Sequence, residues 1–95
     1  MAQIEEIESP VALSTSSLTV LPAKGNRDFV HFQNGDTTET IVLSNNGEDA
    51  SSSHYQLKLR PGDGYPITNS ESAAAEWRAA SLSGTPDLAL WTTFR

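Results

Sequence analysis

Two histidines are the side chains of this sequence best suited to acid–base chemistry. A catalytic nucleophile needs a base within reach and a third group that orients the base. His31 lies between Val30 and Phe32 in a predicted strand and is expected to face away from them, while His54 directly follows Ser53. A serine-rich chain offers such Ser–His neighbours by chance, so we interpret both histidines as surface or half-buried polar residues. The sequence therefore predicts no catalytic residue and no enzyme.

Carboxylates that could bind a metal occur as two pairs. Asp36 and Glu39 share the segment NGDTTE, and Glu48 and Asp49 are adjacent. Calcium requires several oxygen ligands, so each pair would need backbone carbonyls to complete a site. The chain has no cysteine for a disulfide or a thiolate zinc site. The PGDGYP stretch (residues 61–66) lacks the lysine and the following helix of a phosphate loop, so we expect neither a metal nor a cofactor.

Aromatic side chains are the remaining candidates for binding, and they are Tyr55, Tyr65, Trp77 and Trp91. They could stack on sugar rings if exposed, but in a chain with few large residues we interpret them as core or interface residues. Trp91 stands out because it would point outward if Leu88 and Leu90 point inward. An outward tryptophan predicts a subunit interface.

The elements that position these residues are short alternating segments separated by turns. Clusters of Ser, Asn, Gly and Pro break the chain at spacings typical of an all-β domain. The alternation predicts strands around residues 18–20, 30–32, 41–43, 55–59, 65–67, 77–79 and 88–91. We expect a small antiparallel β-sandwich, jelly-roll-like, with a small barrel as the alternative. The predicted core is Leu18, Val20, Val30, Phe32, Ile41, Leu43, Leu57, Leu59, Ile67, Trp77, Ala79, Leu88 and Leu90.

The first seventeen residues differ from the rest of the chain. Glutamates surround Ile4 and Ile7, and Pro10 follows. We therefore divide the chain into an extended N-terminal arm, residues 1–17, and a single β-sandwich domain, residues 18–95. The arm is either a disordered acidic tail or a segment that docks Ile4 and Ile7 onto a neighbouring subunit. Residues 70–76 form the one helix-like stretch and predict a loop with at most one helical turn.

Composition narrows the classes of function. The chain has 95 residues and a net charge of −6, so it has room for one core and lacks the clustered positive charge that binds nucleic acid. It contains no apolar run long enough to span a membrane, and its glutamate-rich start is unlike a signal peptide. We expect a soluble protein that is made in the cytoplasm.

Three segments resemble a family of small bacteriophage virion proteins. They are LPAKGNRDFVHFQN (residues 21–34), QLKLRPG (56–62) and EWRAASLSGTPDLALW (76–91). The family pattern usually has a proline near the arginine that opens the strand, whereas Lys24, Gly25 and Asn26 precede Arg27 here. The resemblance implies a capsid decoration (cement) protein, a fibre-attachment domain or a tail accessory domain.

These arguments lead to one expected function and one alternative. We expect a non-enzymatic virion structural protein that binds and stabilises the phage capsid surface. Its partners would be the major capsid protein or another virion protein and its own copies, as a homotrimer, with neither nucleic acid nor membrane bound. The expected contact residues are Ile4, Ile7 and Trp91. The alternative is a carbohydrate-binding or tail-fibre accessory module for host attachment.

Overall fold

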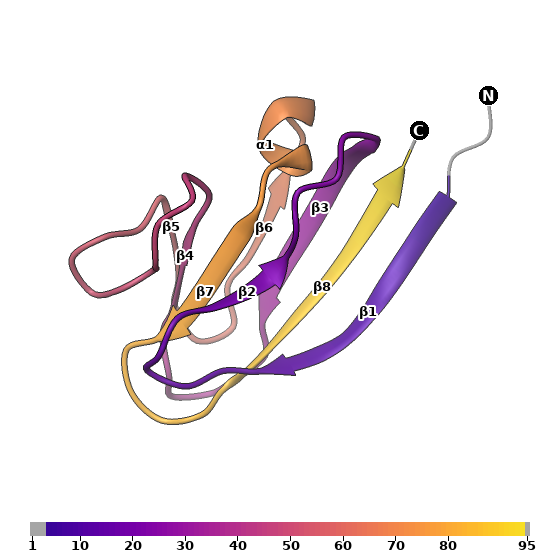
Figure 1. Ribbon diagram of the computed structural model, residues 1–95. Helices are drawn as coiled ribbons and strands as arrows, with labels where there is room; N and C mark the ends of the chain where they lie inside the picture. Colours follow the sequence, from indigo (N-terminus) through magenta and orange to yellow (C-terminus); the bar gives the residue numbers. More distant parts are fainter. Residues whose placement is uncertain (1–3, 95) are drawn as a thin grey trace.

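Two four-stranded antiparallel sheets pack face to face in the computed structural model, which describes residues 4–94, with side chains from residue 10 onward (Figure 1). One sheet has the order β1-β8-β3-β6 and the other β2-β7-β4-β5. The elements are β1 (Ile4–Ala12), β2 (Leu18–Leu21), β3 (Arg27–Asn34), β4 (Ile41–Ser44), β5 (Leu57–Leu59), β6 (Gly64–Ile67), α1 (Ser70–Ala74), β7 (Trp77–Ser81) and β8 (Asp87–Phe94).

The strand order is that of a jelly roll. The first and last strands, β1 and β8, are neighbours in one sheet, and β2 and β7 are neighbours in the other. The chain passes repeatedly from one sheet to the other, which is the double Greek key of a jelly roll. The predicted all-β, jelly-roll-like sandwich is confirmed. No helix within residues 4–94 is long and apolar enough to cross a bilayer.

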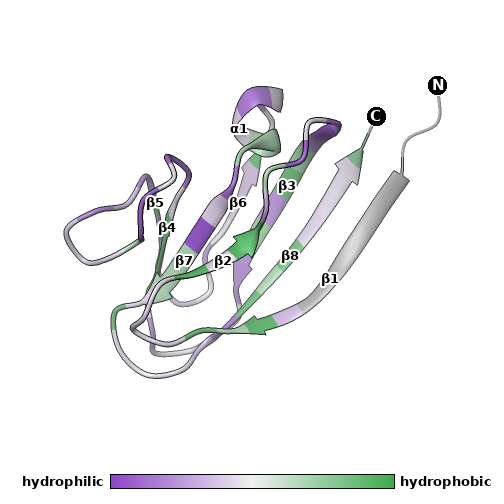
Figure 2. Cartoon of the chain, viewed as in Figure 1, coloured by the Kyte–Doolittle hydropathy of each residue, from purple (hydrophilic) through white to green (hydrophobic). Residues whose placement is uncertain are grey.

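Alternation along the strands produces the core. In β8 the side chains of Leu88, Leu90 and Thr92 are buried while those between them are half-buried, because successive side chains of a strand point to opposite faces. Figure 2 shows hydrophobic segments interrupted by polar ones along β3 and β7. Most of the predicted core is confirmed, with Val20, Leu57 and Ile67 only partly buried.

Leu18 is a wrong core prediction, since 38% of it is exposed. It begins β2, an edge strand of its sheet, where no neighbouring strand covers it on one side. Leu13, Leu21, Ala73 and Phe94 are buried instead. These four residues lie outside the alternating segments, so the sequence pattern did not identify them as core residues.

The predicted N-terminal arm contributes a strand to the sandwich rather than extending away from it. Ile4–Ala12 form β1, which pairs antiparallel with β8. Without β1, the long strand β8 would leave a row of backbone N–H and C=O groups unpaired at the sheet edge. The register shifts between Glu8 and Val11, on either side of Pro10, which has no N–H to donate.

Arg27 fastens the helix to the first sheet. Its buried guanidinium donates from Nε to the Ala73 carbonyl at 2.6 Å, and from Nη2 to the carbonyls of Ala75 at 2.8 Å and Pro22 at 3.1 Å. The planar donor fork of arginine suits several carbonyl groups at once. Arg27 is thus a structural residue.

Asn34 ends β3 through its side chain rather than through a special backbone conformation. Its backbone is not left-handed, since no described non-glycine residue has a positive φ. Its buried side chain instead donates to the carbonyls of Glu39 at 2.8 Å and Leu59 at 3.0 Å and accepts from the Asp36 N–H at 3.0 Å. One amide therefore satisfies three backbone groups where the chain leaves the first sheet.

Candidate functional site

The outward side of the β1-β8-β3-β6 sheet presents a partly aromatic surface on its two central strands, bordered by the carboxylates of Asp87 and of Asp28, which accepts from Thr93 Oγ1 at 2.9 Å. Its described residues on the two central strands are half-buried and alternate with the core residues. We call this surface the Trp91 face, and it consists of Phe29, His31, Gln33, Ala89, Trp91 and Thr93. With histidine neutral, none of the six carries a charge, although the chain has 18 charged residues. Depletion of charge and enrichment in aromatic residues are typical of the centre of a protein interface.

The aromatic residues of the Trp91 face are held in a fixed arrangement. His31 and Trp91 are cross-strand partners, and their rings stack with centroids 4.5 Å apart and an interplanar angle of 18°. His31 Nε2 lies 3.2 Å from Gln33 Oε1, and Gln33 Nε2 donates to the Gly62 carbonyl at 3.0 Å. This arrangement lowers the conformational entropy that a partner would have to remove on binding.

Trp91 is outward-facing, as the alternation of β8 predicted, and Ile7 lies beside it in the sheet. The Cα of Ile7 pairs with that of Trp91, and Ile4 pairs with Phe94. The side chains of Ile4 and Ile7 lie outside the described residues. The structure thus brings the backbones of the three predicted contact residues onto two adjacent strands.

The outward side of the other sheet is covered by the chain itself. Residues 45–56, which connect β4 and β5, fold back so that Ala50 contacts the outward side chains Val42 and Ala80. All three residues are at most 3% exposed. Alternation alone would place Val42 and Ala80 at the surface, and the connection buries them as a second, small core.

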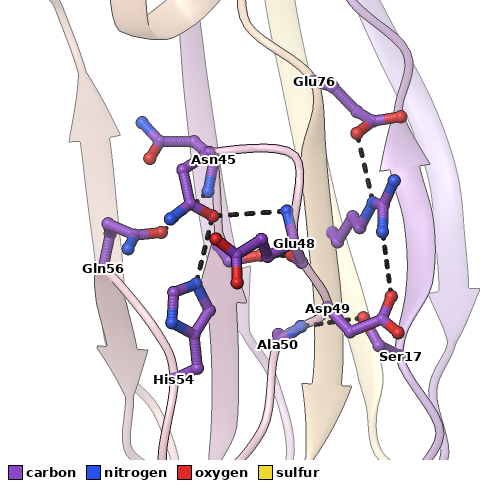
Figure 3. Close-up of polar contacts among 11 residues, drawn as sticks. Ser17, Asn45, Glu48, Asp49, Ala50, His54, Gln56 and Glu76 are labelled. Carbon is purple, nitrogen blue, oxygen red and sulfur yellow. Dashed lines mark hydrogen bonds and ion pairs between the residues drawn. The ribbon is translucent and has the colours of Figure 1, made fainter.

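Polar contacts hold this covering connection in place (Figure 3). The Ala50 N–H donates to Ser17 Oγ at 3.0 Å. Arg78 Nη1 contacts Asp49 Oδ1 at 3.0 Å, and Arg78 Nε contacts Glu76 Oε1 at 3.1 Å. Hydrogen bonding to Asp49 and the nearby charge of Glu76 raise the pKa of Arg78, while partial burial opposes them. Glu48 and Asp49, considered above as metal ligands, thus belong to a structural connection.

The side chains that could do acid–base chemistry do not come together. His54 Nε2 lies 3.1 Å from Asn46 Oδ1, and Ser53 interacts with Ser51. His31 lies in the first sheet, stacked on Trp91. Among the described side chains, those of residues 10–94, no group of three or more His, Cys, Asp or Glu is arranged to hold a metal.

Asp36 stabilises its own loop. Its Oδ2 accepts from the N–H of Thr38 at 3.0 Å and from that of Glu39 at 2.8 Å. These backbone hydrogen bonds lower the pKa of Asp36 below its ordinary value of 3.8. Glu39 Oε1 accepts from Ser83 Oγ at 2.5 Å. The carboxylates of Asp36 and Glu39 are therefore engaged by the protein's own donors.

A pocket of about 380 Å³ opens at the sandwich edge where β5 and β6 lie. It is lined by Asn45, Gln56, Leu57, Tyr65, Pro66, Ile67, Thr68, Ser72 and Trp77. Tyr65 is 51% exposed and Tyr55 is 40% exposed, so neither is a core residue, and their predicted place in an interface stays a prediction. Both lie near sheet edges, where strand alternation says little about burial.

Comparison with known proteins extends the description of the fold. No protein-family model and no curated protein matches the sequence. Among solved structures, the chain is similar to the solution NMR structure of a de novo designed double-stranded β-helix. The two share 18% sequence identity and a TM-score of 0.51 over 98% of this chain and 99% of that chain. At this identity the similarity concerns the fold alone, and it agrees with the jelly-roll strand order.

Proposed function

We propose that this chain is a non-enzymatic structural protein of a bacteriophage virion, which binds the capsid surface through the Trp91 face. The observation that carries the proposal is the contrast between the two outward sheet faces. Residues 45–56 cover one face, whereas the described residues place no comparable connection over the other. A face with an uncharged centre and a stacked His–Trp pair suits a partner protein better than it suits water.

The sequence supports the virion context and the class of partner. The three segments that resemble small phage virion proteins include most of β3 and β8, the strands that carry the Trp91 face. The partner is the major capsid protein or a neighbouring virion protein. The protein assembles as a homotrimer on the particle, which would compensate for the small core of a 95-residue chain.

Co-sedimentation with particles that lack the protein tests this function. The wild-type protein should sediment with such particles, and Trp91→Ala should weaken binding about 10- to 100-fold, as for a central interface aromatic. Tyr55→Ala is the matched control, because Tyr55 is an exposed aromatic outside the Trp91 face. It should bind like the wild type.

Two further measurements make the outcome decisive. Thermal melting of each free variant separates loss of binding from loss of folding. Analytical ultracentrifugation shows whether the protein is a trimer, both free in solution and after release from the particle. The proposal fails if the wild-type protein does not sediment with the particles, or if folded Trp91→Ala binds as well as Tyr55→Ala.

A further inference from the structure

The pocket between β5 and β6 has features of a small-ligand site that the proposed virion role does not use. Its volume of about 380 Å³ lies within the range of small-molecule sites in proteins. None of its nine lining residues is charged. A charged ligand would find no counter-ion there, so the lining favours a neutral polar ligand.

The polar groups around the pocket have hydrogen-bonding capacity to spare. Gln56 Oε1 accepts from the Asn45 N–H at 2.9 Å, which fixes the Gln56 side chain and leaves its NH₂ donors to face a ligand. Asn45 and Gln56, both labelled in Figure 3, line the same pocket. Each amide carries two N–H donors, and two amides that line one pocket suit the hydroxyl groups of a sugar ring.

Tyr65 supplies an apolar surface beside these amides. It is the most exposed of the large hydrophobic side chains that the structure describes, at 51%. An aromatic ring presents a flat face on which the C–H side of a pyranose can stack, while its phenol group stays available for hydrogen bonding. Trp77 closes the inner end of the pocket, and its Nε1 donates to the Ser72 carbonyl at 2.9 Å.

We propose that the pocket between β5 and β6 binds a neutral sugar ring, stacked on Tyr65 and hydrogen-bonded by the side-chain amides of Asn45 and Gln56. The site is separate from the Trp91 face, since it lies at the edge of the sandwich where the two sheets part. A particle-bound copy could therefore present this pocket to a host-surface glycan while the Trp91 face holds the capsid.

The two tryptophans allow a direct test by NMR of the full-length, ¹⁵N-labelled protein. D-Glucose, D-galactose, D-mannose and N-acetyl-D-glucosamine are titrated separately, and the two indole N–H signals are followed. At least one sugar should shift the Trp77 indole signal, which reports on the pocket, and leave that of Trp91 unchanged. Sialic acid, which is anionic, should shift neither signal.

Three variants sharpen the result. Tyr65→Ala should weaken the binding of the active sugar about tenfold or more, whereas Tyr55→Ala should not change it. Gln56→Glu keeps an acceptor for the Asn45 N–H but lacks the NH₂ donors, so it should bind several-fold more weakly. Both tyrosines are exposed, so both alanine variants should melt like the wild type. The proposal is overturned if none of the four sugars shifts the Trp77 signal, or if Tyr65→Ala binds as the wild type does.

Discussion

The two outward faces of this sandwich are built from similar strands, but the described part of the chain covers the centre of one face and not that of the other. On the β2-β7-β4-β5 sheet, Val42 and Ala80 point outward and are nevertheless buried under Ala50. On the other sheet, Trp91 and His31 point outward, stack on each other and stay half-buried. This difference between the two faces is the observation on which the proposed partner surface on the Trp91 face rests.

Removal of β1 should have the largest effect, because β1 pairs with β8, the strand that carries Trp91. Deletion of residues 1–12 removes β1 and leaves β8 unpaired on one side. We expect the melting temperature of the free domain to fall by about 10 °C or more, measured by circular dichroism. Full retention of the melting temperature would mean that this segment is a dispensable arm after all.

A charge placed under the covering connection should break folding. Ala50 is 3% exposed, so Ala50→Glu buries a carboxylate against Val42 and Ala80 or displaces the connection. The free energy of unfolding should fall by about 2–3 kcal/mol in urea titrations. Ser52→Glu, at an exposed position of the same connection, should remain within about 0.5 kcal/mol of the wild type. Equal stability of the two variants would show that the face is not covered.

The same change on the Trp91 face should spare folding and impair binding. Ala89 is half-buried on the outward side of β8, and a glutamate there can reach water. Ala89→Glu should change the free energy of unfolding by about 1 kcal/mol at most, but its carboxylate should prevent close docking onto particles. A variant that binds normally would place the contact surface elsewhere on the protein.

The sequence predicted the alternating strands well because each alternation is a local signal. It placed Trp91 outward correctly, since Leu88 and Leu90 fix the parity of β8. It missed β1 because IEEIESPVA does not alternate, and the pairing of β1 with β8 joins opposite ends of the chain. It also missed the covering role of Ala50, a small residue in a polar stretch, whose burial depends on where the connection folds back. The pocket beside Tyr65 combines residues of β5, β6, α1 and β7 with the two ends of the 45–56 connection, and it could not be assembled from local patterns.

The smallest expected effect concerns the loop of residues 35–40, which connects β3 in the sheet with the Trp91 face to β4 in the other sheet. The pKa of Asp36 is lowered in the folded protein by the N–H groups of Thr38 and Glu39, so its carboxylate adds stability above its ordinary pKa of 3.8. That stability is lost as the pH falls through the lowered pKa of the folded state. Asp36→Ala should therefore melt about 2 °C lower than the wild type near neutral pH.

This difference should vanish in more acidic solution, where both proteins carry an uncharged residue at position 36. Asp87→Ala, at an exposed position, serves as the control for general effects of charge. A difference between Asp36→Ala and the wild type that is independent of pH would show that the carboxylate's charge is not what holds the loop.

Hydroxyl-radical footprinting of the free and the particle-bound protein tests the central claim most directly. It compares the oxidation of Trp91 and Phe29 on the Trp91 face with that of Tyr55 on the other side of the sandwich, within the same sample. The account predicts that Trp91 and Phe29 become protected on the particle while Tyr55 is oxidised equally in both states. Protection of Tyr55 with unchanged oxidation of Trp91 would contradict it.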